Sequence, residues 1–223
     1  MRQPQRSPAH LAVGRACLDG GVSLTFTAID FETANSHGAS ACQVGMVRVE
    51  GGQAVARLES LIKPPMGYDE FLPWNVRVHG IRPAMVADAP ELPELLPQML
   101  ELIGAEPMVA HNAPFDMSVL RAAARVHQLD LPPLQYLCSV RLARKTWRLD
   151  SYRLPDAAFA AGFEGFQHHD ALADAEACAA IVIGAARRHH VASLAELCSI
   201  TGVKPAPVAK PERPVPPAGS WRL

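Results

Sequence analysis

Two carboxylates stand two residues apart in an otherwise apolar run, Ala28-Ile29-Asp30-Phe31-Glu32-Thr33. In a β-strand, residues i and i+2 project from the same face, so the side chains of Asp30 and Glu32 converge while Phe31 faces the other way. Adjacent carboxylates repel each other, and a divalent cation between them would remove that repulsion. The alternative for an isolated Asp-x-Glu is a strand end that turns into solvent, so a metal site requires further ligands from elsewhere.

A third carboxylate follows a short apolar strand, in the segment His111-Asn112-Ala113-Pro114-Phe115-Asp116. Pro114 stands where a helix prefers proline, in its first turn, which places Asp116 in that turn as well. Such an aspartate can simply complement the helix dipole. In an open α/β sheet, however, the carboxyl ends of the strands are where ligands bind.

A third segment, His168-His169-Asp170-Ala171-Leu172-Ala173-Asp174, precedes a long alanine-rich stretch. Asp170 is suited to cap a helix that begins at Ala171, with Asp174 in the first turns of that helix. Five residues correspond to ~500° of helical rotation, so His169 and Asp174 do not share a helix face. We therefore expect His169 in the preceding loop, reaching back over the site, and we interpret His168 as a solvated loop residue.

Together these segments offer four carboxylates and one histidine at strand ends and helix starts. Oxygen ligands favour Mg²⁺ or Mn²⁺ over zinc. Two such ions ~3.5–4 Å apart can stabilise both the attacking and the leaving oxygen of phosphodiester hydrolysis. A histidine with an ordinary pKa of ~6.5 can take a proton from the attacking water, so activity should rise between roughly pH 6 and 8.

The surrounding sequence predicts an α/β fold, a mixed five-stranded sheet flanked by helices. Expected strands cover 24–30, 43–49, 55–62, 108–110 and 134–138, with a hairpin turn at Gly51-Gly52. Expected helices cover 91–103, 115–127, 140–147, 153–161 and 171–188. Residues 22–200 are expected to form one domain, between a flexible leader (1–21) and a Pro-rich tail (201–223) expected to be disordered.

Composition narrows the class of protein. The 223 residues carry a formal net charge of -1, which argues against a tight non-specific nucleic-acid binder but not against a nuclease that uses metal ions in a local groove. No apolar run reaches the ~20 residues of a membrane span, and no signal-peptide core is present. The five cysteines form no Cys-x-x-Cys pair, which favours reduced thiols and a cytoplasmic protein.

The three segments, in this order, resemble the motifs of the DnaQ-like 3′→5′ exonucleases of the DEDDh type, and Val78-His79-Gly80-Ile81 matches a further family segment. The resemblance runs from about Leu24 to Arg188. It implies a ribonuclease H-like exonuclease fold in which Asp30, Glu32, Asp116 and Asp174 hold two Mg²⁺ or Mn²⁺ ions. It also implies that His169 is the general base, that Glu32 orients the attacking water, and that the substrate is bound by Thr33, His79, Asn112 and Phe115.

The function expected from this resemblance is metal-dependent removal of nucleoside monophosphates from the 3′ ends of DNA, with single strands favoured, in proofreading, replication or repair. RNA 3′ ends are an alternative substrate, because the motifs address metal and phosphate rather than the sugar. A second alternative is a binding module whose Pro-rich tail docks a DNA polymerase or another protein. Replicative proofreading subunits of the family carry a longer C-terminal segment, and no Gln for a clamp-binding peptide follows Gln167, which argues against a replisome role.

Overall fold

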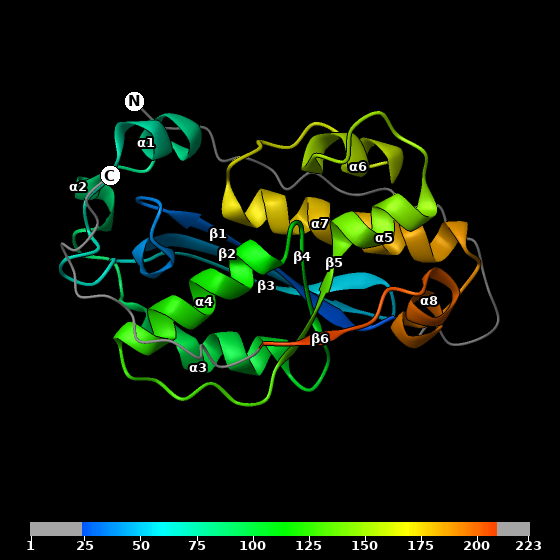
Figure 1. Ribbon diagram of the computed structural model, residues 1–223, viewed down its shortest axis with the longest axis horizontal. Coiled ribbons are helices and arrows are strands. Elements are labelled where there is room, and N and C mark those ends of the chain that lie inside the picture. Colours follow the sequence, from blue (N-terminus) through cyan, green and yellow to red (C-terminus); the bar gives the residue numbers. More distant parts are fainter. Residues whose placement is uncertain (1–23, 209–223) are drawn as a thin grey trace, which may run out of the picture.

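A computed structural model describes residues 24–208, which form a six-stranded sheet with helices on both faces (Figure 1). The strand order is β3-β2-β1-β4-β5-β6. The strands are β1 (Phe26–Thr33), β2 (Ala41–Glu50), β3 (Gln53–Leu61), β4 (Met108–Ala110), β5 (Gln135–Cys138) and β6 (Ala206–Pro207).

Strand β1 lies inside the sheet and joins its two halves. It pairs antiparallel with β2 on one side and parallel with β4 on the other. The β2–β3 hairpin turns at Gly51 and Gly52, whose φ angles of 57° and 74° are those that a tight hairpin turn requires. This turn confirms the antiparallel start that the sequence predicts.

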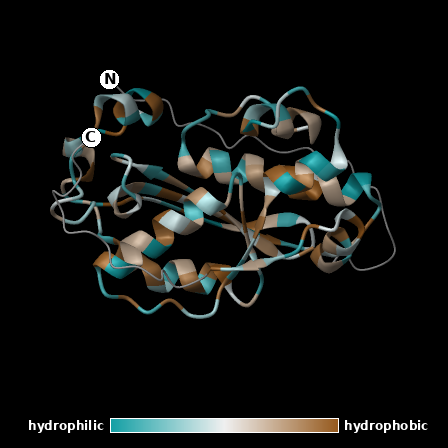
Figure 2. Ribbon diagram, viewed as in Figure 1, coloured by the Kyte–Doolittle hydropathy of each residue, from teal (hydrophilic) through white to brown (hydrophobic). Residues whose placement is uncertain are grey.

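Two helical layers cover the sheet, α3 and α4 on one face and α5, α6 and α7 on the other (Figure 1). Hydrophobic and hydrophilic residues are mixed around each long helix, as expected where one side packs and the other meets water (Figure 2). The helices are η1 (Gly38–Ser40), α1 (Pro73–His79), α2 (Pro83–Val86), α3 (Leu92–Ile103), α4 (Pro114–Val126), α5 (Ser139–Thr146), α6 (Leu154–Ala160), α7 (Ala171–Arg188) and α8 (Leu194–Thr201).

Alternate residues of β1 enter two separate hydrophobic cores. Phe26 and Ala28 belong to the core that contains residues of α7, whereas Ile29 and Phe31 belong to the core under α3 and α4. Because side chains alternate along a strand, Asp30 and Glu32 continue the first series. Both carboxylates therefore lie on the α7 side of the sheet, as the spacing predicts.

The start of α7 is pressed against β2 by two residues of that strand. A Cβ atom at Gly45 would overlap the backbone of Ala171 and Leu172. The buried side chain of Gln43 accepts a hydrogen bond from the Ala171 N–H at 3.4 Å. These contacts fix the distance between the start of α7 and the sheet, and with it the position of Asp174.

Replacing Gly45 with alanine should therefore destabilise the protein and displace α7. Overpacking a rigid contact costs about 1–3 kcal/mol, and here the obstruction is backbone, which cannot change rotamer. We expect a lower midpoint in thermal or urea unfolding than that of the unsubstituted protein. An unchanged midpoint would contradict this packing.

The sequence predicts most elements within one or two residues, and the strand 108–110 and the helix 171–188 match fully. The sheet has six strands rather than five, because Ala206–Pro207, predicted as part of a disordered tail, pairs with β5. The sequence did not predict α1, α2 or α8. Helices α1 and α2 begin with proline and are too short for an apolar periodicity to be detected. The predicted leader and the residues after 208 lie outside the described part of the chain.

Within residues 24–208, none of the helices combines the length and the apolar character needed to cross a bilayer. The four cysteines in this range are free.

Candidate active site

A cleft of about 580 Å³ opens where β1 ends, between that strand, α1, the start of α4 and the loop before α7. It is lined by most of the site residues that the sequence predicts: Asp30, Glu32, Thr33, His79, Phe115, His169 and Asp174.

Three carboxylates meet at the floor of this cleft. Asp30, Glu32 and Asp174 each present an oxygen such that the three atoms lie within 4.8 Å of one another. Asp30 and Glu32 come from β1, whereas Asp174 comes from the first turns of α7, over 140 residues later. The fold thus brings together three of the four predicted metal ligands from distant segments.

The fourth, Asp116, is buried behind them in the first turn of α4. Strand β4 pairs with β1 only at Thr27 and Ala28, so the N–H of Phe31 lies past the end of β4 and is bonded to Asp116 Oδ1 at 3.2 Å. The other oxygen, Oδ2, is buried and has no hydrogen-bond partner among the described residues. An unpartnered buried carboxylate oxygen is costly, and a cation would satisfy it.

Burial raises the pKa of every one of these carboxyl groups, and repulsion by neighbouring carboxylates adds to the shift for Asp30, Glu32 and Asp116. Burial raises the pKa of Glu32 to about 8, and the charges of Asp174 and Asp116 add to the shift. Burial likewise raises the pKa of Asp116 to about 8, although the Phe31 N–H opposes the change. The pKa of Asp30 is raised well above its usual range by burial and then by Asp116, and that of Asp174 is raised by burial. Oxygen donors whose charges repel one another fit a divalent cation of the Mg²⁺ or Mn²⁺ type.

These shifts make the stability of the metal-free protein depend on pH. Glu32 and Asp116 have folded-state pKa values near 8, above their unfolded values, so the folded state holds protons that the unfolded state releases. That stabilisation is complete below the unfolded pKa values and is lost as pH rises through about 8. With a chelator present, we expect the melting temperature to fall by several degrees between about pH 5 and pH 9, and Asp116→Asn should flatten the profile. A melting temperature that rises across this range would contradict the assignment.

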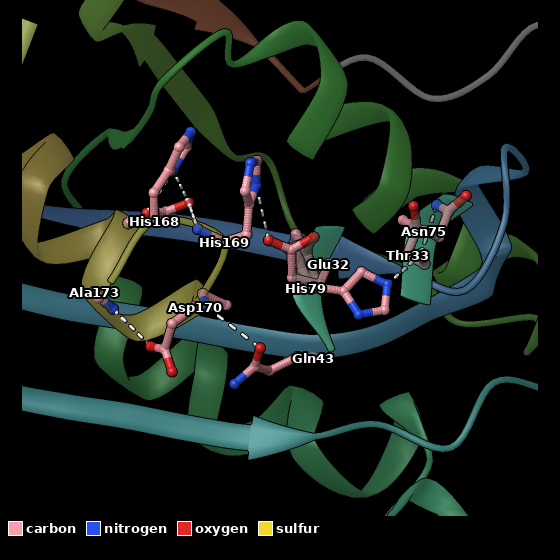
Figure 3. Close-up of polar contacts among 12 residues, drawn as sticks. Glu32, Thr33, Gln43, Asn75, His79, His168, His169, Asp170 and Ala173 are labelled. Atoms are coloured by element: carbon pink, nitrogen blue, oxygen red, sulfur yellow. Dashed lines mark hydrogen bonds and ion pairs between the residues drawn. The ribbon is translucent and has the colours of Figure 1, made fainter. Parts of the chain in front are cut away.

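His169 lies over the carboxylates in a strained loop conformation with φ of 69° (Figure 3). Its backbone N–H donates to Asp174 Oδ2 at 3.0 Å, and its Nδ1 lies 3.9 Å from Glu32 Oε1. Burial and the neighbouring His168 lower the pKa of His169, while the side chain is still 42% exposed. A neutral, accessible imidazole beside the carboxylates can accept a proton from a water molecule.

His168 is exposed and lies in the loop before α7, as the sequence predicts, but it also makes contacts in the site that the sequence did not reveal. Its Nδ1 lies 3.0 Å from Asp174 Oδ2, and its ring stacks on His169 with centroids 3.8 Å apart (Figure 3). His168 thus supports both the ring of His169 and the carboxylate of Asp174. The only indication of these contacts in the sequence was that the two histidines are adjacent. The contacts depend on the conformation of the loop before α7, which a local sequence pattern does not predict.

Helix α1 is attached to the end of β1 through the Thr33 carbonyl. That oxygen accepts a hydrogen bond from Asn75 Nδ2 at 2.9 Å and lies 3.2 Å from His79 Nε2 (Figure 3). Since His79 Nδ1 accepts the Ile81 N–H at 3.0 Å, Nε2 carries the proton and donates. Thr33 and His79 both line the cleft, with His79 fully engaged in holding α1 in place.

The two remaining sequence candidates differ in position. Phe115 is 45% exposed and lines the cleft. Asn112 is exposed, adopts a φ of 67° in the β4–α4 turn, and is not among the residues lining the cleft. Asn tolerates this left-handed conformation, so its observed part is to shape the turn that leads to Asp116.

His111 lines the same cleft and was not selected from the sequence. Its Nε2 donates to the Tyr152 carbonyl at 3.0 Å, and its Nδ1 accepts from the Ser139 hydroxyl at 2.8 Å. Burial lowers the pKa of His111 to about 4, so the ring is neutral near pH 7. It ties the end of β4 to α5 and to the loop before α6.

The family model described as "Exonuclease" matches residues 27–182 of the chain. The chain is 32% identical over 181 residues to the DNA polymerase III subunit epsilon of Aquifex aeolicus, covering 79% of this chain and 86% of that protein. It is 35% identical over 164 residues to a Mycobacterium tuberculosis protein described as a bifunctional exonuclease/endonuclease, covering 69% of this chain but only 25% of that protein. The chain also spans 14% of a PolC-type DNA polymerase III of Thermotoga maritima, at 30% identity.

Among solved structures, Exonuclease X in complex with 5′-overhanging duplex DNA superposes with a TM-score of 0.63 at 28% identity. The match covers 79% of this chain and 99% of that one.

Proposed function

Since this chain belongs to the exonuclease family and has its ribonuclease H-like fold, we propose that it is a metal-dependent 3′→5′ exonuclease that removes nucleoside monophosphates from DNA, preferring single strands. The family assignment makes it a nuclease. The polarity, the substrate and the residue roles below are our proposal.

The observation that carries this proposal is the cluster of Asp30, Glu32 and Asp174, together with the repulsion that Asp116 exerts on Asp30 and the buried, unpartnered oxygen of Asp116. Asp30, Glu32 and Asp174, with Asp116 behind them, would hold two Mg²⁺ or Mn²⁺ ions. Such ions supply stabilisation of the charge that develops on the phosphate oxygens.

The other residues of the cleft have distinct tasks. His169 accepts the proton of the attacking water, which Glu32 orients, and the contacts of Asp174 with His168 and the His169 backbone keep that imidazole in place. Thr33, held by Asn75 and His79, and the exposed ring of Phe115 bind the terminal nucleotide.

DNA is favoured as substrate because two of the three named relatives are DNA polymerase III proteins and Exonuclease X is bound to DNA. RNA is the second candidate, since the carboxylates and His169 address metal and phosphate rather than the sugar. A polymerase partner that binds through the Pro-rich tail is proposed on the same relatives; residues 209–223 of that tail lie outside the described range.

The test uses single-stranded DNA labelled at its 5′ end, with Mg²⁺ or Mn²⁺. We expect a ladder that shortens from the 3′ end one nucleotide at a time, and no cleavage with a chelator. An RNA of the same sequence measures sugar preference. Shortening from the 5′ end, or internal cuts alone, would overturn the proposal.

A further inference from the structure

An exposed tryptophan stands at the rim of the cleft. Trp74, in the first turn of α1, is 69% exposed and lines the cleft. Among the described residues only seven large hydrophobic side chains are exposed, and Trp74 and Phe115 are the two that line the cleft. The other five are Val55, Met66, Met85, Phe159 and Ile200.

The ring of Trp74 is carried on a firmly held element. The next residue, Asn75, and His79 one turn later both bond the Thr33 carbonyl beside the catalytic carboxylates. The guanidinium carbon of Arg77 lies 6.0 Å from the centroid of the Trp74 ring. The position of α1, and with it the place of Trp74 at the rim, is thus tied to the end of β1.

This combination suits a nucleobase. Every base has a π-face, and stacking on an aromatic side chain contributes about 1–3 kcal/mol per base without regard to sequence. A cation beside the ring favours the adjacent phosphate. Arg153 is the only Lys or Arg among the described residues that line the cleft, and Arg77 lies beside Trp74 outside that lining. Ring and cation together therefore provide binding that the acidic floor does not.

Building on the proposed function, we propose that Trp74 is a specificity-determining residue that stacks on an unpaired base of the substrate strand, with Arg77 beside the strand's backbone. A base paired within a duplex has its faces covered by its neighbours and is not free to stack on Trp74. The rim of the cleft therefore selects for single-stranded 3′ ends. Trp74 lines the cleft, whereas Met66 and Met85, which are also exposed, do not. This position beside the acidic site favours nucleic acid over a protein as the occupant of Trp74.

Steady-state kinetics with a single-stranded oligonucleotide test this role. Trp74→Ala should raise KM by about 5- to 150-fold, the equivalent of losing one stacked base, while kcat changes less than about twofold. Trp74→Phe should restore most of the affinity, and the ratio of single-stranded to blunt-duplex hydrolysis should fall in Trp74→Ala. Phe159→Ala is the matched control, since Phe159 is 66% exposed and lies outside the cleft lining.

A binding measurement separates this inference from the proposed chemistry. A phosphorothioate oligonucleotide, which resists hydrolysis, should quench tryptophan fluorescence of the wild type but not that of Trp74→Phe, whose two other tryptophans remain. Such quenching without any hydrolysis of ordinary DNA would sustain the stacking role and refute the nuclease proposal. Hydrolysis with an unchanged KM in Trp74→Ala would refute the stacking role.

Discussion

Asp30→Asn should reduce hydrolysis by at least about a thousandfold and leave the fold intact. Charge stabilisation by a bound metal ion is worth several kcal/mol in the transition state, and each 1.36 kcal/mol is tenfold in rate. Asp30 reaches the site from β1 and shares the ligand cluster with Glu32 and Asp174. Removing its charge should therefore weaken metal binding as well as turnover.

The fold should tolerate this change because the folded, metal-free protein already favours a neutral Asp30. Burial and the surrounding carboxylates raise the pKa of Asp30 well above its usual range, and asparagine has the shape of a protonated carboxyl group. We expect the chelated variant to melt at the wild-type temperature or above. The rise in melting temperature that Mg²⁺ gives the wild type should be diminished.

Glu176→Gln is the matched control for charge. Glu176 lies on α7 two residues beyond Asp174 and pairs with Arg57 at 2.6 Å, a partly exposed pair outside the ligand cluster. This variant should retain nearly full activity. Retention of more than about a tenth of the wild-type rate by Asp30→Asn would remove Asp30 from the metal-binding set.

His169→Asn should lower turnover by about 10²- to 10⁴-fold, the usual contribution of a general base. Asparagine is the appropriate replacement because it tolerates the positive φ of 69° at this position. Metal affinity, measured by calorimetry, should persist. Loss of metal affinity in parallel with rate would make His169 a ligand instead.

The dependence of activity on pH distinguishes the ionisation of His169 from that of the carboxylates. A general base works when deprotonated, so activity rises with pH through its pKa, and burial together with His168 places that pKa below 6.5. With saturating metal the rise should thus be centred below the ordinary histidine value and be absent from His169→Asn. With limiting metal, the ionisation of Glu32 and Asp116 near pH 8 controls loading, and the rise should move to higher pH.

His190→Asn is the control for replacing a histidine by asparagine in a left-handed backbone conformation. His190 has a φ of 54°, follows the end of α7 and lies outside the cleft. Its replacement makes the same chemical change in the same backbone conformation. Its rate and pH profile should match those of the wild type.

Local patterns in the sequence were sufficient for the parts of the site that depend on strand alternation or helix ends. The spacing of Asp30 and Glu32 predicts a shared face, and Asp170 predicts the start of α7, where its side chain accepts the Ala173 N–H. What could not be predicted depends on contacts between distant segments. Gln43 and Gly45 hold α7 only because β2 lies under that helix, and His168 contacts Asp174 only because of the loop conformation.

The same reasoning explains the errors in the fold. Strand β6 comprises two residues and owes its assignment to β5, since Ala206 and Pro207 carry no strand pattern of their own. Helix α1 contains no buried residue, so it has no apolar face for periodicity to reveal. Its position is determined instead by the hydrogen bonds of Asn75 and His79 to Thr33.

The separation of Asp30 and Asp174 in the sequence also determines when the carboxylate cluster can form during synthesis of the chain. Ribosomes deliver a chain from its N-terminus at about 5–20 residues per second, and β1 through β5 emerge well before α7. Until α7 is made and settles against Gly45, the nascent chain lacks Asp174 and the loop that carries His169. The full set of carboxylates described above can therefore assemble only once the chain has been synthesised at least through α7.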